Sequence, residues 1–249
     1  MFLAEQSLFL QIKTWFTTVF QDFIADFYLN FIDDNRWIYL VKGLGITLLV
    51  AFFAVILGVI IGFLVAIIRV SGDQTGKLKL PNFICKLYLT VFRGTPVVIQ
   101  ILIINFVIFA SVDINKVLVA IIAFGFNSGA YVAEIIRSGI LSIDYGQMEA
   151  GRSLGFSYVK TMAYIILPQA FKNVLPALGN EFIVLLKETS VSGYIGLADL
   201  TKGGDIIRSA TYSPFMPYMA VAAIYLVIVI GLTKLLGLLE RKVRESDKR

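Results

Sequence analysis

The sequence predicts an all-α integral membrane protein with five transmembrane helices, an N-terminal amphipathic helix and a short helix in a cytoplasmic loop. Only 16% of its 249 residues are charged, whereas a soluble domain usually carries about 25%. The hydrophobic fraction is 58%, and the apolar residues gather in long runs without charge. These runs are continuous rather than alternating, which is typical of helices and excludes a transmembrane barrel.

The first run, 45–68, has 24 residues without a charge. As a helix it would extend about 36 Å, enough to cross a hydrocarbon core of about 30 Å. Three further uncharged runs predict crossings at 94–112, 117–133 and 215–233. The fourth crossing in chain order, 161–186, is mostly apolar but carries two charges and two prolines that we expect to break its helix: Lys172, Glu181, Pro168 and Pro176. Five crossings place the two termini on opposite sides.

The basic residues predict the orientation. Of the 22 Lys and Arg residues, 13 lie in the loop after the first span, in the loop between the third and fourth spans, and in the tail. The positive-inside rule assigns these segments to the cytoplasm, so the N-terminus lies outside and the C-terminus inside. The basic residues border the spans and lack interleaved aromatics, which argues against a nucleic-acid partner. We divide the chain into an amphipathic segment, a transmembrane domain and a basic tail: 1–36, 37–240 and 241–249.

Near the N-terminus, four phenylalanines spaced four, three and four residues apart predict one apolar helix face: Phe16, Phe20, Phe23 and Phe27. Asp22 and Asp26 argue against a membrane crossing here. Two placements remain open. The helix either lies at the outer membrane interface or packs on the bundle.

The sequence offers little from which to build an active site. It has no His, and its single cysteine, Cys85, is interpreted as an apolar packing residue, so no metal site is expected. The stretch 72–78 resembles a phosphate-binding loop, but only three residues separate its glycines, and Leu78 rather than Ser or Thr follows Lys77. We interpret it as a polar turn between two spans. Any ATP is therefore handled by another chain, and this chain is not expected to be an enzyme.

The most informative segment, 140–156, lies between the third and fourth spans. Residues 149–154 predict a short helix with Gly155 placed to end it. One spacing there resembles the signature of ABC importer permeases: Glu149-Ala150-Gly151, three residues, Gly155, nine residues, then Ile165-Ile166-Leu167-Pro168. Gly151 departs from the usual Ala of that signature, which lowers helix propensity but keeps the residue small.

The resemblance implies that about 138–160 is a coupling loop whose helix docks into an ATP-binding subunit. Its expected coupling residues are Glu149, Ala150, Gly151, Arg152 and Gly155. It also implies a multi-pass protein of the bacterial cell inner membrane. The implied partners are two copies of an ABC ATPase that binds ATP and magnesium, a second permease subunit (identical or a sibling) and an extracytoplasmic amino acid-binding protein. No cofactor is expected in this chain.

Further short motifs resemble the branch of this family that imports polar amino acids: Arg93-Gly94-Thr95-Pro96 at the head of the second span, 129–137 with Glu134 and Arg137, and the stretches around Pro168 and Pro176. Glu134 and Arg137 are three residues apart on one helix, so we expect them to pair. Two glycine pairs have the spacing for close helix approach: Gly58 with Gly62, and Gly125 with Gly129.

Polar residues inside the spans are expected to face the bundle interior, because an unpaired polar group is costly in lipid. We hypothesise that five of them line the substrate path: Asn105, Asn127, Ser128, Asn180 and Glu181. The alternative is that each only bonds neighbouring helices together. Glu181 favours a cationic amino acid such as arginine, lysine or histidine, and glutamine remains open. A secondary amino acid transporter driven by an ion gradient is the other function class, although we find no convincing internal repeat.

Overall fold

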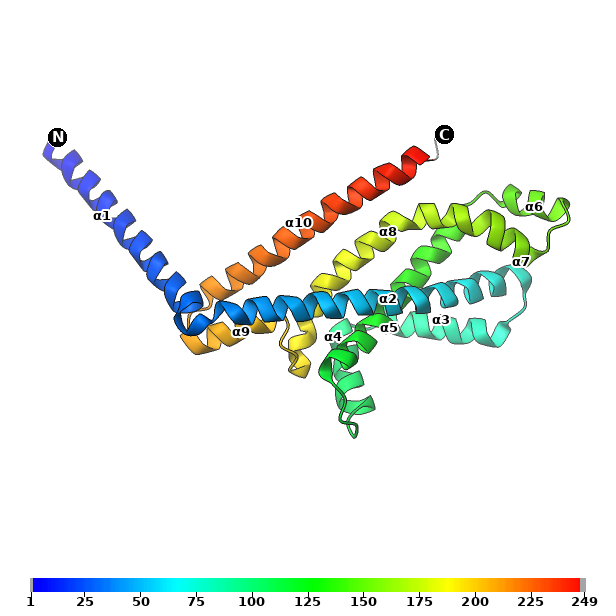
Figure 1. Ribbon diagram of the computed structural model, residues 1–249, viewed down its shortest axis with the longest axis horizontal. Coiled ribbons are helices and arrows are strands. Elements are labelled where there is room, and N and C mark those ends of the chain that lie inside the picture. Colours follow the sequence, from blue (N-terminus) through cyan, green and yellow to red (C-terminus); the bar gives the residue numbers. More distant parts are fainter. Residues whose placement is uncertain (1, 247–249) are drawn as a thin grey trace.

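The computed structural model describes residues 2–246, and over these residues the chain is built of helices joined by short turns (Figure 1). The α-helices are α1 (Phe2–Phe27), α2 (Trp37–Thr75), α3 (Lys79–Gly94), α4 (Val97–Ile103), α5 (Lys116–Leu141), α6 (Tyr145–Ser153), α7 (Tyr158–Thr161), α8 (Leu167–Glu188), α9 (Leu200–Thr211) and α10 (Phe215–Ser246). Three π-helical segments are η1 (Tyr28–Ile32), η3 (Ile104–Ile108) and η4 (Met162–Ile166), and two 3₁₀ segments are η2 (Asp33–Asn35) and η5 (Thr189–Ile195).

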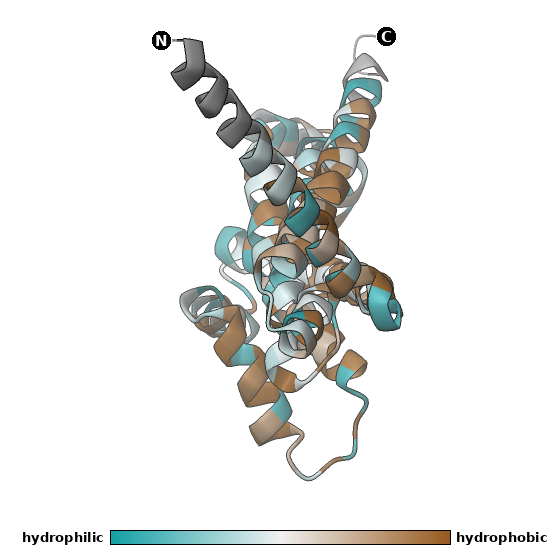
Figure 2. Cartoon of the chain, turned by 90° about the vertical axis from the view of Figure 1, so that its left-hand side faces the viewer, coloured by the Kyte–Doolittle hydropathy of each residue, from teal (hydrophilic) through white to brown (hydrophobic). Residues whose placement is uncertain are grey.

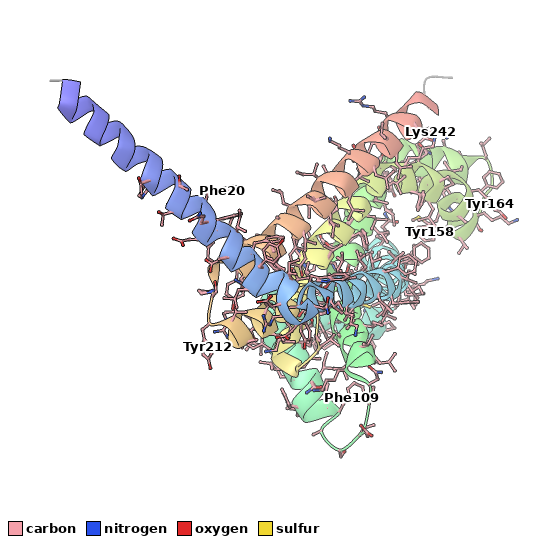
Figure 3. All side chains as sticks on the ribbon, turned by 60° about the vertical axis from the view of Figure 1, so that its left-hand side comes forward. Phe20, Phe109, Tyr158, Tyr164, Tyr212 and Lys242 are labelled. Carbon is pink, nitrogen blue, oxygen red and sulfur yellow. The ribbon has the colours of Figure 1, made fainter. Side chains whose placement is uncertain are left out.

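Helices α2 and α5 form the centre of the bundle, with α3 and α8 beside them. Helix α9 lies across the start of α2, and α10 contacts α8 and α9. The turn between α2 and α3 and the loop that holds α6 and α7 therefore lie at one end of the molecule, and α9 lies at the other (Figure 1). Figure 3 shows the same division, with Tyr158 and Lys242 far from Tyr212.

Within the described residues, three helices are long and apolar enough to cross a membrane: α2, α5 and α10. They contain the predicted runs 45–68, 117–133 and 215–233. Helix α3 together with α4 and η3 meets the same measure only as one pair bent by 111°, which is either a broken span or a re-entrant loop. Helix α8, in the predicted fourth crossing, does not meet the same measure of length and composition. A total of five crossings therefore stays a prediction.

The predicted crossing 94–112 does not form one continuous helix. Its helical part, α4 with η3, has only 12 residues, about 18 Å, because the chain turns sharply after Gly94. Thr95 is extended, with φ −123° and ψ 148°, since the ring of Pro96 disfavours a helical conformation in the residue before it. Only together with α3 does this segment reach the length of a membrane span. The arm of α4 and η3 projects from the body and is mostly hydrophobic (Figure 2).

The contact between α2 and α5 depends on glycines from both helices, as the sequence predicted. A Cβ atom on Gly58 would lie 3.1 Å from Ser128 Cβ, and one on Gly62 would lie 2.7 Å from Val132 Cβ. In return, α2 packs Leu57 over Gly125 and Ile61 over Gly129. The two backbones approach closely only because these side chains are absent.

The prolines of the fourth crossing do not both break its helix. Pro176 lies inside α8, which continues through it to Glu188. Pro168 lies in the first turn of α8, where a missing N–H is tolerated. The π-helical segment η4 directly precedes α8, so the irregular backbone lies before Pro168 rather than around both prolines. A hinge at this place stays a prediction.

Helix α1 leaves the bundle instead of packing on it (Figure 1). The side chains of Phe20, Phe23 and Phe27 are exposed, while that of Phe16 lies outside the described residues. The structure therefore does not support the alternative of a helix packed on the bundle. Its placement at a membrane interface stays a prediction. The chain returns to the bundle at Asn30, whose buried amide oxygen accepts a hydrogen bond from Thr211 at 2.8 Å.

Replacing Gly62 by Ala is expected to weaken the contact between α2 and α5, because the new Cβ would meet Ala133 N at 2.8 Å as well as Val132. Overpacking of this kind costs about 1–3 kcal/mol, so detergent-purified protein should unfold at a lower temperature. Gly45→Ala is the matched control, since it lies on the same helix with no atom within 4 Å of its Cβ position. Equal unfolding temperatures for the two variants would contradict the role of this contact.

Candidate functional site

The loop between α5 and α8 contains a short helix, α6, which begins at Tyr145, four residues before the predicted start at Glu149, and ends at Ser153. Asp144 begins it by accepting a hydrogen bond from Gly146 N at 2.6 Å. Gly155 ends it with φ +84°, a left-handed conformation that favours glycine. Phe156 N donates to Gly151 O and Gly155 N donates to Arg152 O, both at 3.1 Å, which is the Schellman pattern of a helix end. The predicted role of Gly155 in ending the helix is confirmed.

Helix α6 has one buried and one exposed side. Gly151 is buried against α7 and η4, and a Cβ there would lie 2.5 Å from Thr161 Cγ2. Sequence reasoning noted that Gly151 is small, but it could not identify this contact with Thr161 as the reason. Glu149, Ala150 and Arg152 are exposed. Of the residues predicted to couple to an ATPase, Gly151 therefore packs inside the loop, whereas Glu149, Ala150 and Arg152 form an exposed face. Their coupling role stays a prediction.

A hydrogen bond joins this loop to the end of α2. Tyr158 Oη donates to Gln74 Oε1 at 2.8 Å. The phenol of Tyr158 is protonated at neutral pH and so can donate this bond, and burial raises its pKa further above the usual range. Gln74 lies in the last turn of α2, which ends at Thr75, and Gly76 follows with φ +66°. The predicted turn 72–78 is therefore confined to 76–78, because its first four residues continue α2.

A cavity of about 690 Å³ lies between α5, α8 and α10. Its lining comes from α3, α5, α8 and α10 and is rich in polar and charged side chains: Arg93, Tyr131, Glu134, Ser138, Lys172, Asn173, Glu181 and Glu240. Ser128 Oγ, fully buried on α5, donates to Glu181 Oε1 at 2.9 Å. Glu181 is 9% exposed and lines the cavity. A buried carboxylate with a free oxygen toward a cavity can accept hydrogen bonds from a cationic ligand.

The five predicted path residues do not all meet at this cavity. The structure brings Ser128 and Glu181 together. Asn127 is 2% exposed and donates to Gln100 Oε1 at 2.8 Å, so its amide bonds α5 to α4. Asn105 lies half-buried on η3, Asn180 is exposed on α8, and neither lines the cavity. The hypothesis of a substrate path therefore narrows to Ser128 and Glu181.

The cavity wall near α3 holds a cluster of charges. The predicted pair is confirmed, because Arg137 Nε lies 3.2 Å from both carboxylate oxygens of Glu134. Arg93 joins the pair from α3, with Nη1 at 3.7 Å from Glu134 Oε2, and its guanidinium lies 5.8 Å from the Tyr131 ring centroid. Arg93 thus connects the bend after α3 to α5, which its position in the motif did not predict.

Gln100 organises that bend. Its Nε2 donates to Phe92 O at 2.8 Å, to Thr95 O at 3.0 Å and to Thr95 Oγ1 at 2.9 Å. These acceptors lie where the turn at Pro96 interrupts helical hydrogen bonding, so one side chain satisfies groups that lipid could not. Gln100 is one of two amides in the apolar run 94–112, and it lies four residues after Pro96. The sequence alone did not assign it to the site.

These features are typical of a membrane transport subunit. The chain has a bundle of membrane-crossing helices, a capped helix exposed at one end and a polar cavity between its helices. Residues 58–245 match the family described as "Binding-protein-dependent transport system inner membrane component". The chain belongs to this family, the permease components of ABC importers. The match sets aside the alternative of a secondary transporter.

Individual relatives agree with the family. The chain is 38% identical over 211 residues to the arginine transport system permease protein ArtQ of Bacillus subtilis (strain 168), covering 84% of this chain and 94% of that protein. It is 36% identical over 208 residues to the glutamine transport system permease protein GlnP of Escherichia coli (strain K12), with 82% and 93% covered.

Solved structures show the same likeness. A chain described in "Crystal structure of an amino acid ABC transporter with histidines" is similar with a TM-score of 0.77 and 44% identity, over 85% of this chain and 98% of that one. The inward-facing methionine ABC transporter MetNI is similar with a TM-score of 0.67 at 23% identity, over 83% and 95% of the two chains. At that identity the second likeness concerns the fold alone.

Replacing Gln100 by Leu is expected to destabilise the bend, because Asn127 Nδ2 and two acceptors at Thr95 would lose their partner. Each buried polar group left unpaired costs about 1–3 kcal/mol, so thermal unfolding in detergent should begin at a clearly lower temperature. Gln169→Leu is the control, since the exposed Gln169 amide makes one bond, to Ile165 O at 2.7 Å. If both variants unfold alike, the amide of Gln100 does not hold the bend.

Proposed function

We propose that this chain is the membrane subunit through which an ABC importer moves a polar amino acid into the cytoplasm, driven by ATP hydrolysis in a separate subunit. The observation that carries the proposal is α6. It is a short helix, locked on one side by Gly151 against Thr161, with Glu149 and Ala150 exposed on the other. Small exposed residues beside one carboxylate would let α6 insert closely into a groove on a partner protein. From the family to which the chain belongs, we infer that this partner is an ABC ATPase.

The orientation follows from the basic residues. The turn between α2 and α3, the coupling loop and the end of α10 gather at one end of the molecule (Figure 3). The loop after the first predicted span, the loop between the third and fourth spans and the tail together hold 13 of the 22 Lys and Arg residues, so we assign this end to the cytoplasm and the N-terminus to the outer side. The complex we propose contains two ATPase subunits with ATP and magnesium, and a second permease subunit, identical or a sibling.

The opposite end is where we place the extracytoplasmic binding protein. Helix α9 carries Lys202, Asp205 and Arg208 on one side, with Lys202 Nζ at 2.7 Å from Asp205 Oδ2 and Arg208 Nη2 at 2.7 Å from Asp205 Oδ1. Hydrogen bonds from Lys202 and Arg208 lower the pKa of Asp205 to about 2. The three side chains therefore stay charged at neutral pH, and their charges are held in fixed positions that the binding protein could recognise.

The proposed mechanism is alternating access with one continuous path for force. Closure of the ATPases moves α6, which pushes on α7 and η4 through the contact of Gly151 with Thr161 and Ile165. These segments continue into α8, which carries Glu181 at the cavity. Movement of α8 against α5 therefore changes access to the cavity. This chain supplies a path and a lever, and the bond chemistry belongs to the partner.

The cavity supports an amino acid substrate with a positive group. Glu181 accepts from Ser128 and keeps lone pairs for an ammonium or guanidinium. Relatives are named for arginine and glutamine transport, and a similar solved structure is described with histidines. All these amino acids carry an α-ammonium, while arginine adds a second cationic group. We propose a cationic amino acid as the preferred substrate.

Coupling is tested by Glu149→Lys. The variant reverses the charge of the exposed carboxylate on α6, and a like charge at a docking contact costs several kcal/mol. We expect the ATPase subunit to be lost on affinity purification of this chain. Asp113→Lys is the control, because it makes the same charge change in the turn between η3 and α5, far from α6. If the ATPase still co-purifies with Glu149→Lys, the coupling face is misassigned.

Substrate preference is tested by Glu181→Gln in the reconstituted complex. Removing one charge-assisted hydrogen bond costs about 1.5–3 kcal/mol, so the arginine concentration that half-stimulates ATP hydrolysis should rise about 10- to 100-fold. The glutamine concentration that half-stimulates ATP hydrolysis should change less. Glu240→Gln, which alters another carboxyl group in the lining of the same cavity, is the control. An unchanged response to arginine in Glu181→Gln would exclude Glu181 from the substrate site.

A further inference from the structure

Helix α3 exposes an apolar stripe that no described part of the chain covers. Leu80 is 69% exposed and Phe83 64%, and three further residues continue the stripe at helical spacing: Ile84, Leu87 and Val91. The opposite side of α3, with Cys85 and Leu89, is buried against the bundle. Because α3 with α4 and η3 is long and apolar enough to form a broken membrane span, we place this stripe against the acyl chains of the bilayer.

Basic residues follow one edge of the same helix. Lys79 and Lys86 are seven residues apart and so lie on one side, and Lys77 precedes them in the turn. Helix α3 contains no Asp or Glu. The carboxylate nearby, Asp73, is held by Arg69 at 3.2 Å, with Lys86 Nζ farther away at 3.8 Å. Over the described residues, the ammonium groups of Lys77 and Lys79 have no anionic partner.

We propose that this corner of α2 and α3 binds the headgroup of an anionic phospholipid, with its phosphate at Lys77, Lys79 and Lys86 and its acyl chains along the apolar stripe. Lysine stems run along apolar surface while their ammonium groups reach the headgroup level. A lysine near an anionic membrane surface strengthens binding by about fivefold. The proposal rests on the cytoplasmic orientation given under the proposed function.

The corner is also mechanically joined to the coupling loop. Gln74, three residues before Lys77, accepts the hydrogen bond from Tyr158 at 2.8 Å. A headgroup that fixes the corner therefore fixes one support of the loop that holds α6. Anionic lipid is thus expected to raise the coupling of ATP hydrolysis to substrate, and not merely to coat the protein.

The lipid site is tested on the purified complex of this chain with its ATPase, by native mass spectrometry with added phosphatidylglycerol. Lys77→Gln, Lys79→Gln and Lys86→Gln together should weaken retention of the lipid on the order of 100-fold. Lys234→Gln, Arg241→Gln and Lys242→Gln together remove the same charge from the end of α10 and should leave retention unchanged. Retention equal to wild type in the α3 triple variant overturns the site. Displacement of the lipid by inorganic phosphate also overturns it, because the lysines would then recognise free phosphate.

The link to coupling is tested in vesicles of phosphatidylcholine with increasing phosphatidylglycerol. Substrate-stimulated ATP hydrolysis should rise with phosphatidylglycerol in wild type and in the α10 variant, and should stay flat in the α3 variant and in Tyr158→Phe. A rise that persists in Tyr158→Phe overturns the link. If no amino acid stimulates hydrolysis in any vesicle, the proposed function fails, while lipid retention still reports separately on the site.

Discussion

The close approach of α2 and α5 is the contact on which the other elements depend. Lipid provides no hydrophobic force between helices, so they associate through packing and hydrogen bonds. Gly58 and Gly62 on one helix and Gly125 and Gly129 on the other let the two backbones come together. That pairing buries Ser128 at the interface, where it reaches Glu181 of α8. The packing of α2 against α5 therefore also positions the polar side chains beside the cavity.

The second constraint is the cost of an unpaired polar group away from water. The bend between α3 and α4 opens helical hydrogen bonding at Thr95 and Pro96, and the two N–H groups of the Gln100 amide are shared among three acceptors there: Phe92 O, Thr95 O and Thr95 Oγ1. Asn127 then attaches the bend to α5. Arg93 and Glu134 extend the connection on the cavity side. The irregular backbone in this span is therefore satisfied by side chains and forms part of the cavity wall.

Much of the architecture was readable from local pattern. The uncharged runs predicted α2, α5 and α10. The glycine spacing predicted the close contact between α2 and α5, and Gly155 predicted the end of α6. The bend at Thr95 was missed because hydropathy continues across it, although the conformational restriction before Pro96 was visible. Asn127 was assigned to the substrate path because spacing cannot tell a residue that faces a cavity from one that bonds a neighbouring helix. Those distinctions depend on tertiary contacts.

The π-helical segment η4 has a consequence for how α8 can move. A π turn holds one residue more than an α turn, so it stores a single surplus residue between α7 and α8. Release of that residue into regular winding would rotate everything beyond it by about 100°. Glu181 would swing away from Ser128 while the main-chain ladder stayed closed. In this way α8 could rotate and change which of its side chains faces the cavity, without losing a turn of backbone hydrogen bonds in lipid.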